Sequence, residues 1–258
     1  MGRLIGLLGH YLVLAVDGVG RFTLLVWQVL SRWTAVFRSR GRVADQMQFV
    51  GVTSLPLIML TSVFVGAVTT WQTAYQIKNY VPMRYLGTAV GSAIVIELAP
   101  VLSALVVAGR VGAGMAAEIG TMKVTEQVDA LESMAIDPVR FLVVPRVVAG
   151  LIMLPILVVF ADLVAIGGAM AVSVLFLKVP QETFVSGFKL FFKISDVMVG
   201  LYKAAIFGLI LTLVGCDQGL GARGGALGVG RATTRAVVVA SVAILIADYL
   251  IAVLMFRQ

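Results

Sequence analysis

The fold is decided by residues 97–138, which read ELAPVLSALVVAGRVGAGMAAEIGTMKVTEQVDALESMAIDP. This stretch begins in the middle of an apolar segment and continues directly into an acidic, amphipathic segment without membrane character. Such a pattern is typical of a membrane helix that passes into a helix in contact with water. The sequence therefore predicts a membrane span joined to a docking element in the aqueous phase.

The composition of the whole chain agrees with this interpretation. Of its 258 residues, 60% are hydrophobic and only 13% are charged, which is far outside the range of a soluble domain. Five apolar stretches reach the roughly 20 residues that a helix needs to cross the hydrocarbon core. They are residues 49–71, 85–109, 147–177, 197–216 and 236–256. None alternates as the strands of a membrane barrel do, so we expect an all-α, polytopic membrane protein with about five transmembrane helices.

The region before the first span, residues 1–46, is expected to hold an interfacial amphipathic helix and a connector. Polar residues recur there at helical spacing and leave a broad apolar face, a pattern typical of a helix lying in the membrane interface. These polar residues are Arg3, His10, Asp17, Arg21, Gln28 and Arg32. Residues 47–258 are expected to form one transmembrane domain. With a single His and a single Cys, the chain predicts neither a metal site nor an internal disulfide.

Basic residues indicate the orientation. Most of the 20 Lys and Arg residues fall in cytoplasmic segments when the N-terminus is placed inside, as the positive-inside rule requires. Five crossings then place the C-terminus outside and the acidic segment inside. The net charge of +7 is explained by anchoring to the membrane surface, so we expect no nucleic acid partner.

Three acidic residues interrupt the spans, namely Glu97, Asp162 and Asp248. An ionised side chain at mid-membrane costs about 2.5–3.5 kcal/mol, and Pro100 removes the hydrogen bond to the Ile96 carbonyl. We therefore expect Glu97 to line a cavity at a kinked point, although a protonated or paired Glu97 that holds helices together is the alternative. The three acids also allow a proton relay. No basic partner is identifiable from the sequence, which favours hydrogen bonds between helices for Asp162 and Asp248.

The first span ends in a polar and aromatic series. Gln72, Tyr75 and Gln76 are three and four residues apart, so they share one face of a helix. That face suits a ligand with both apolar and polar parts. The alternative is that the aromatic residues only anchor the helix at the membrane interface.

The acidic segment is expected to form one amphipathic helix from Glu118 to Met134, within a predicted coupling element at residues 115–137 that Pro138 ends. Its polar positions Glu118, Thr125, Asp129 and Glu132 are expected on one side, and the acids Glu126 and Asp137 add to its negative charge. The negative surface lies next to an otherwise basic face of the protein. It is either a solvated helix or a docking site for a partner of complementary charge.

The chain carries no nucleotide-hydrolysis motif. No G-x-x-x-x-G-K-[ST] loop occurs, so any ATP chemistry is expected in a separate partner. Residues 219–224 match G-x-G-x-x-G, but they follow a membrane span and lack the βαβ context of a dinucleotide site. No catalytic constellation is visible, and we expect a protein that is not an enzyme.

Three elements resemble the MlaE/YrbE family of ABC transporter permeases in order and spacing: AGRVGAG at 108–114, AEIGTMKVTEQVDALESMAIDP at 117–138 and GRATTRAVV at 230–238. The resemblance covers residues 48–256. It departs from the family pattern at Ile96, where relatives often carry Arg, and at Ala99, where Gly is common.

The resemblance implies a permease subunit that moves phospholipids or related lipids between the membrane and an MCE-domain lipid-binding protein in the periplasm. It implies a homodimer in the bacterial inner membrane, with ATP and Mg bound by a separate cytoplasmic ABC ATPase subunit, and it allows a small cytoplasmic accessory subunit. By position, the resemblance assigns Gln72, Tyr75, Gln76 and Glu97 to the lipid site. It assigns Glu118, Glu126, Asp129 and Glu132 to the coupling interface with the ATPase. The rival hypothesis is a proton-coupled secondary transporter that uses the intramembrane carboxylates and needs no ATPase.

Overall fold

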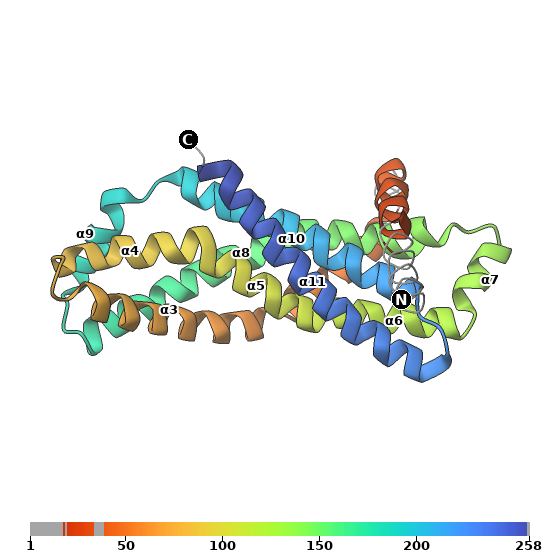
Figure 1. Ribbon diagram of the computed structural model, residues 1–258, viewed down its shortest axis with the longest axis horizontal. Coiled ribbons are helices and arrows are strands. Elements are labelled where there is room, and N and C mark those ends of the chain that lie inside the picture. The colour runs from red at the N-terminus through yellow and green to blue at the C-terminus, as the bar shows by residue number, and fades with distance from the viewer. Residues whose placement is uncertain (1–17, 19, 34–38, 257–258) are drawn as a thin grey trace, which may run out of the picture.

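A computed structural model describes residues 18, 20–33 and 39–256, and within these ranges all regular elements are helices. Five helical segments are long and apolar enough to cross a membrane, and they run along the long axis of the molecule (Figure 1). They are Arg40–Ile77, Met83–Val124, Val139–Leu175, Ile194–Leu220 and Gly225–Met255. The prediction of an all-α membrane protein with five spans is confirmed. Each span is longer than its apolar stretch because polar turns continue the helix at its ends.

Several spans are built from consecutive helical segments. The first contains α2 (Arg40–Met47), the π-helical η2 (Gln48–Val52) and α3 (Leu55–Ile77). The second contains η3 (Met83–Tyr85), α4 (Leu86–Ala93), the π-helical η4 (Ile94–Leu98), α5 (Ala99–Val107), the π-helical η5 (Ala108–Gly112) and α6 (Ala113–Val124). The third contains the π-helical η6 (Val139–Val143) and α8 (Val144–Leu175). The fourth and fifth are α10 (Ile194–Leu220) and α11 (Gly225–Phe256).

Two short helices mark the opposite ends of the molecule. The helix α7 (Gln127–Ser133) follows the second span, and α9 (Gln181–Phe191) follows the third, at the other end of the long axis (Figure 1). We refer to these as the α7 end and the α9 end. The second span thus runs from the α9 end to the turn that precedes α7.

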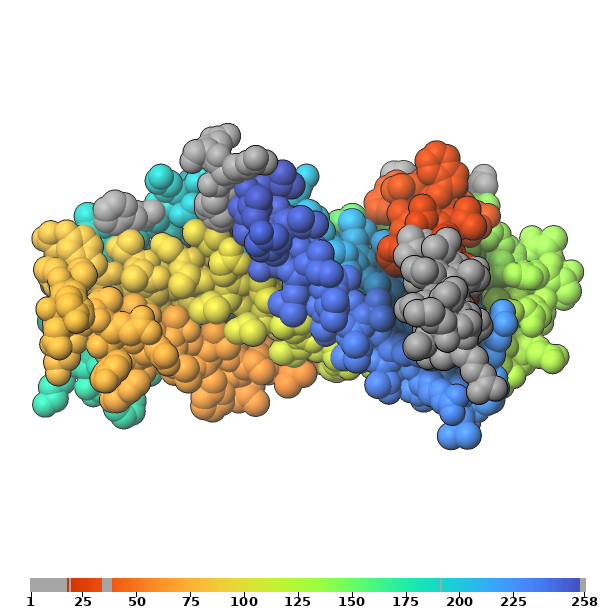
Figure 2. Space-filling view, in the orientation of Figure 1, coloured from red at the N-terminus to blue at the C-terminus, as the bar shows by residue number. Residues whose placement is uncertain are grey.

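The central helix is α8, which packs against α3 and α10. Its large apolar side chains, such as Leu154 and Leu157, are fully buried together with Phe207 of α10. By contrast, α11 covers α10 and α6 but remains uncovered on its outer face, as Figure 2 shows. Exposed apolar residues such as Leu250 and Leu254 extend along it. An apolar face of this kind is suited to lipid or to another subunit within a membrane.

Residues 20–31 form a further helix at the α7 end. Its buried residues Leu25 and Val29 belong to a second apolar cluster that includes Val147 of α8. The side chain of Arg32, just after this helix, pairs with Asp137 at 2.5 Å. That this segment lies in a membrane interface stays a prediction. The earlier polar positions Arg3, His10 and Asp17 fall outside the described residues.

The expectation of one continuous helix from Glu118 to Met134 is wrong. The helix α6 ends at Val124, and Glu126 then adopts a left-handed conformation with φ of 61° before α7 begins. The hydroxyl of Thr125 donates to the carbonyl of Thr121 at 2.8 Å, which closes the last turn of α6. The resulting turn presents α7 as a separate element at the extreme end of the molecule (Figure 1).

Candidate functional site

An ion cluster lies inside the membrane-spanning region, where three helices meet. The Nζ atom of Lys203 on α10 is 2.6 Å from Oε1 of Glu97 on η4 and 2.8 Å from Oδ1 of Asp248 on α11. Lys203 is fully buried, whereas the Glu97 side chain is 40% exposed and that of Asp248 is 20% exposed. The cation is therefore enclosed, while the carboxylate of Glu97 reaches the surface of the span.

The geometry of the second span places Glu97 at this point. Pro100 is the second residue of α5 and has no N–H, so the regular helical hydrogen bonds are interrupted one turn before it. The span responds with the five-residue π-helix η4, which contains Glu97. Single π-helical turns inside long helices are frequent at functional sites. The predicted disruption near Glu97 is thus present, as a π-helical turn.

A close helix contact brings Lys203 to Glu97. Gly200 of α10 lies against the carbonyl of Val95 in η4, and its hydrogen atom leaves room for that carbonyl. Lys203 follows one helical turn later, so its side chain emerges on the same side of α10. The absence of a side chain at Gly200 is therefore what allows the ion pair to form.

The Gly200→Ala variant tests this contact. An added methyl group overlaps the Val95 carbonyl, so we expect α10 to move away from η4 at a cost of about 1–3 kcal/mol. Thermal unfolding of the purified protein measures the loss. Gly167→Ala on α8 is the matched control, because nothing lies within 4 Å of the position of its added Cβ atom. Equal stability of the two variants would show that the close contact is unimportant.

Lys203 is the residue of this cluster that sequence reasoning missed. Its signal is visible, since Lys203 is the one charged residue in the apolar stretch 197–216. Its pairing with both Glu97 and Asp248 depends on helices that are distant in sequence. The third intramembrane acid, Asp162 of α8, is not part of these pairs, and its buried Oδ1 has no hydrogen-bond partner among the described residues. The structure thus brings together two of the three acids considered for a proton relay.

The predicted lipid face on α3 lies toward the α9 end. Gln72, Tyr75 and Gln76 are all exposed, with Tyr75 83% exposed, while Ala74 between them is buried. They share one outward side of the helix, as expected. Glu97 instead contacts Lys203, so the structure does not join these four residues into one pocket within a single chain.

The acidic residues at the α7 end fall into two groups. Glu126, Asp129 and Glu132 are exposed on or next to α7, and Asp129 pairs with Lys123 at 2.5 Å. Glu118 differs from them because its carboxylate lies 2.8 Å from Arg146, a buried residue of α8. Glu118 thereby fastens α6 to α8, whereas the other three acids form an accessible negative surface.

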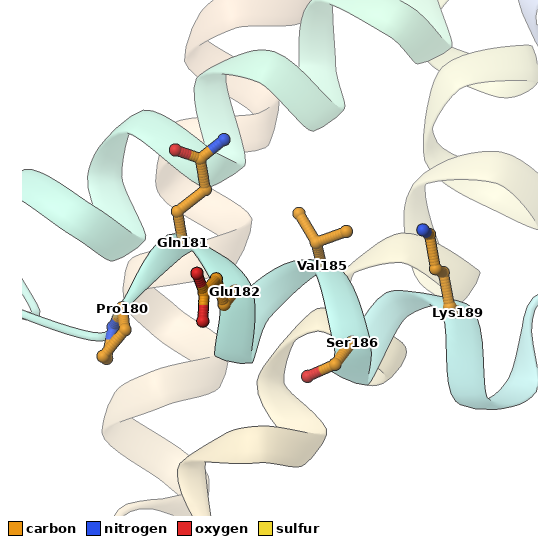
Figure 3. A pocket seen from close by; sticks show the side chains of 6 residues that line it. All are labelled: Pro180, Gln181, Glu182, Val185, Ser186 and Lys189. Atoms are coloured by element: carbon orange, nitrogen blue, oxygen red, sulfur yellow. The ribbon is translucent and has the colours of Figure 1, made fainter.

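The α9 end carries an open concavity of about 700 Å³ lined by Pro180, Gln181, Glu182, Val185, Ser186 and Lys189. Figure 3 shows that Gln181, Val185 and Lys189 point to one side of α9 and Ser186 to the other. All six residues come from one short helix and the residue before it. The concavity holds none of the three cluster residues, so it is separate from the ion cluster.

Comparisons with known proteins agree with this architecture. The model of the family described as "Permease MlaE" matches residues 43–254. The chain is 39% identical to a probable ABC transporter permease protein of Rickettsia typhi over 97% of both chains. It is 41% identical to a probable ABC transporter permease protein of Synechocystis over 85% of this chain and 83% of the relative. With five spans, a π-helical turn at Glu97 and a match across nearly all of its transmembrane region, the chain belongs to the MlaE permease family.

Proposed function

We propose that this protein is the permease subunit of an ABC transporter that moves phospholipids or related lipids. The observation that carries the proposal is the ion cluster of Lys203, Glu97 and Asp248 in an otherwise apolar region. Charged residues within membrane spans are costly and mark substrate paths. A two-tailed lipid, which joins a large apolar volume to a charged head, fits apolar walls with one polar point.

The half-exposed carboxylate of Glu97 is the group placed to meet a headgroup. One of its oxygens faces Lys203, and the remaining acceptor positions are open to donors such as the ammonium or hydroxyl groups of lipid heads. Lys203 holds the carboxylate in position and balances its charge. The Gln72, Tyr75 and Gln76 face offers further polar contacts along the path toward the α9 end.

Several features support assembly with other proteins. The uncovered apolar face of α11 favours a homodimer, in which two copies enclose a lipid cavity. Without a P-loop, the chain needs a separate ATPase subunit that binds ATP and Mg, for which the acidic surface of α7 is the proposed docking site. The α9 end is the proposed contact for an MCE-domain protein, and a small cytoplasmic accessory subunit completes the assembly.

The proposed orientation follows from these assignments. The α7 end lies in the cytoplasm with the N-terminus, and the α9 end lies in the periplasm with the C-terminus. The membrane is the bacterial inner membrane. The distribution of Lys and Arg supports this direction.

In the proposed mechanism, the ATPase subunits move α7 as they close on ATP. The motion passes through α6, η5 and α5 to the π-helical turn that holds Glu97. Long helices bend most easily at π-helical segments, so the displacement of the second span is concentrated at η4, next to the headgroup contact. Lipid is released as the geometry around Glu97 changes.

Crosslinking with a photoactivatable phospholipid tests the proposal. Glu97→Gln removes the charge but keeps the shape, and we expect lipid crosslinking and ATP-driven transport to fall about tenfold, the equivalent of one charged hydrogen bond. Assembly with the ATPase is expected to persist. Asp45→Asn, which neutralises an exposed acid of α2, is the matched control. Unchanged transport by Glu97→Gln would show that the Glu97 carboxylate does not bind the lipid headgroup.

The secondary-transporter hypothesis makes a different prediction in reconstituted vesicles. It requires that a proton gradient alone drives lipid movement by this chain without any ATPase. Our proposal expects movement only with the ATPase and ATP present. Transport by the isolated protein under a proton gradient would replace the ABC mechanism with the proton-coupled one.

A further inference from the structure

A strongly basic pocket lies at the α7 end, apart from the ion cluster. It has a volume of about 210 Å³, and its lining includes Arg21, Asp217, Arg223, Arg231 and Arg235. Among the described residues of the lining, four carry guanidinium groups and one carries a carboxylate, an excess of three positive charges. Guanidinium groups bind phosphate oxygens through paired hydrogen bonds. The chemistry of the lining therefore selects a phosphate-bearing ligand.

An apolar groove lies beside the helix at 20–31 and α10, both of which also line the basic pocket. It has a volume of about 500 Å³, and its lining includes Val26, Leu30, Trp33, Val147, Leu209 and Leu213. These residues come from the helix at 20–31 and the residues just after it, from α8 and from α10. Its walls carry no charged side chain, so it suits a hydrocarbon chain rather than a polar ligand.

The two cavities are neighbours along α10. Leu209, Leu213 and Asp217 are spaced by four residues, so they form one stripe on the helix, and Leu213 and Asp217 are separated by about 6 Å of helix axis. The helix at 20–31 also lines both cavities, with Arg21 at the basic pocket and Val26 at the apolar groove. A guanidinium nitrogen of Arg21 lies 3.8 Å from the position of a Cβ atom on Gly221, which places this arginine against the end of α10.

We propose that these cavities form one site for an anionic phospholipid, with its phosphate in the basic pocket and an acyl chain in the apolar groove. The charge excess selects the anionic head, and the adjoining groove selects a lipid over free phosphate. The site is separate from the proposed transport site, because Asp217 is about 21 Å along α10 from Lys203. It does not depend on the proposed function.

Occupation of this site has a mechanical consequence. The lipid bridges the helix at 20–31 to α8 and α10, and Arg32 at the end of that helix pairs with Asp137 beyond α7. A bound anionic lipid thus stabilises the packing of this helix next to α7. The site makes the protein responsive to the anionic lipid content of the surrounding leaflet.

Native mass spectrometry of the full-length protein tests the headgroup contact. The probes are dioleoylphosphatidylglycerol, dioleoylphosphatidylcholine and inorganic phosphate. We expect the anionic lipid to be retained most strongly, and the Arg231→Gln/Arg235→Gln double variant to weaken its retention at least about tenfold. Arg140→Gln, an exposed arginine outside the pocket, is the control and keeps full binding. Equal retention by the double variant and the control would overturn the proposal.

A second pair of variants tests the groove. Leu30 and Leu24 are both 61% exposed on the same helix, but only Leu30 lines the groove. We expect Leu30→Trp to block the acyl chain and weaken lipid retention several-fold, while Leu24→Trp has no effect. Phosphate that binds as tightly as the lipid, with no effect of Leu30→Trp, would identify an anion site only and refute the lipid assignment. Retention at this site is expected to survive Lys203→Met, so its failure is distinguishable from failure of the transport proposal.

Discussion

The Lys203→Met variant is expected to lose lipid transport by about a hundredfold. Met keeps an unbranched, apolar stem but leaves the carboxylates of Glu97 and Asp248 without their common cation. Removing one partner of a buried ion pair costs about 3–5 kcal/mol, and the partial exposure of Glu97 places the effect at the lower end. An increase of about 3 kcal/mol in the free-energy barrier of the transport step slows transport about a hundredfold. Transport by the reconstituted complex measures it.

Two further variants separate the structural role of Lys203 from its transport role. Lys203→Arg keeps the positive charge and is expected to restore part of the transport. The triple variant Lys203→Met/Glu97→Gln/Asp248→Asn carries no charge in the cluster, so we expect its thermal stability to recover because no unpaired charge remains buried. Its transport is expected to remain low. Normal transport by the triple variant would show that the cluster serves only to pack the helices together.

The second large effect is expected from charge reversal at the α7 end. Changing Glu126, Asp129 and Glu132 together to Lys turns three negative charges into three positive ones. All three side chains are exposed, so the fold is expected to persist while the surface repels a partner that recognises negative charge. We expect binding of the ATPase subunit to weaken at least about a hundredfold, and lipid-stimulated ATP hydrolysis to be lost. Co-purification and hydrolysis rates measure the two effects.

A matched single change identifies the effect as local. Glu132→Lys on α7 and Glu182→Lys on α9 make the same charge change at exposed positions on opposite ends of the molecule. Only the first is expected to weaken ATPase binding and to do so less than the triple change. Glu118 is left unchanged in these experiments, because its pair with Arg146 joins α6 to α8. Intact assembly and hydrolysis with the triple variant would exclude α7 as the docking site.

Much of this protein could be predicted from its sequence because a bilayer imposes a local requirement. Each span must present about 20 mostly apolar residues, and each of the five stretches that satisfy this requirement falls on one observed span, two of them extending past its end by one or two residues. The disruption at Glu97 was predictable for a similar reason, since Pro100 acts on the backbone of its own turn. The acidic character of residues 118–134 was visible as well. Its division into two helices was not, because the amphipathic pattern gives no sign of the left-handed backbone at Glu126.

The sequence by itself determined the number of spans, the membrane location and the family resemblance, since each depends on residues that are neighbours in the chain. Only the tertiary structure decided which charges pair. Lys203 meets Glu97 and Asp248 because Gly200 allows α10 to approach η4 while α11 lies alongside α10. The preference of an apolar residue for the membrane is a property of that residue alone, but an ion pair depends on the distance between two side chains. That distance is set by how three separate helices pack.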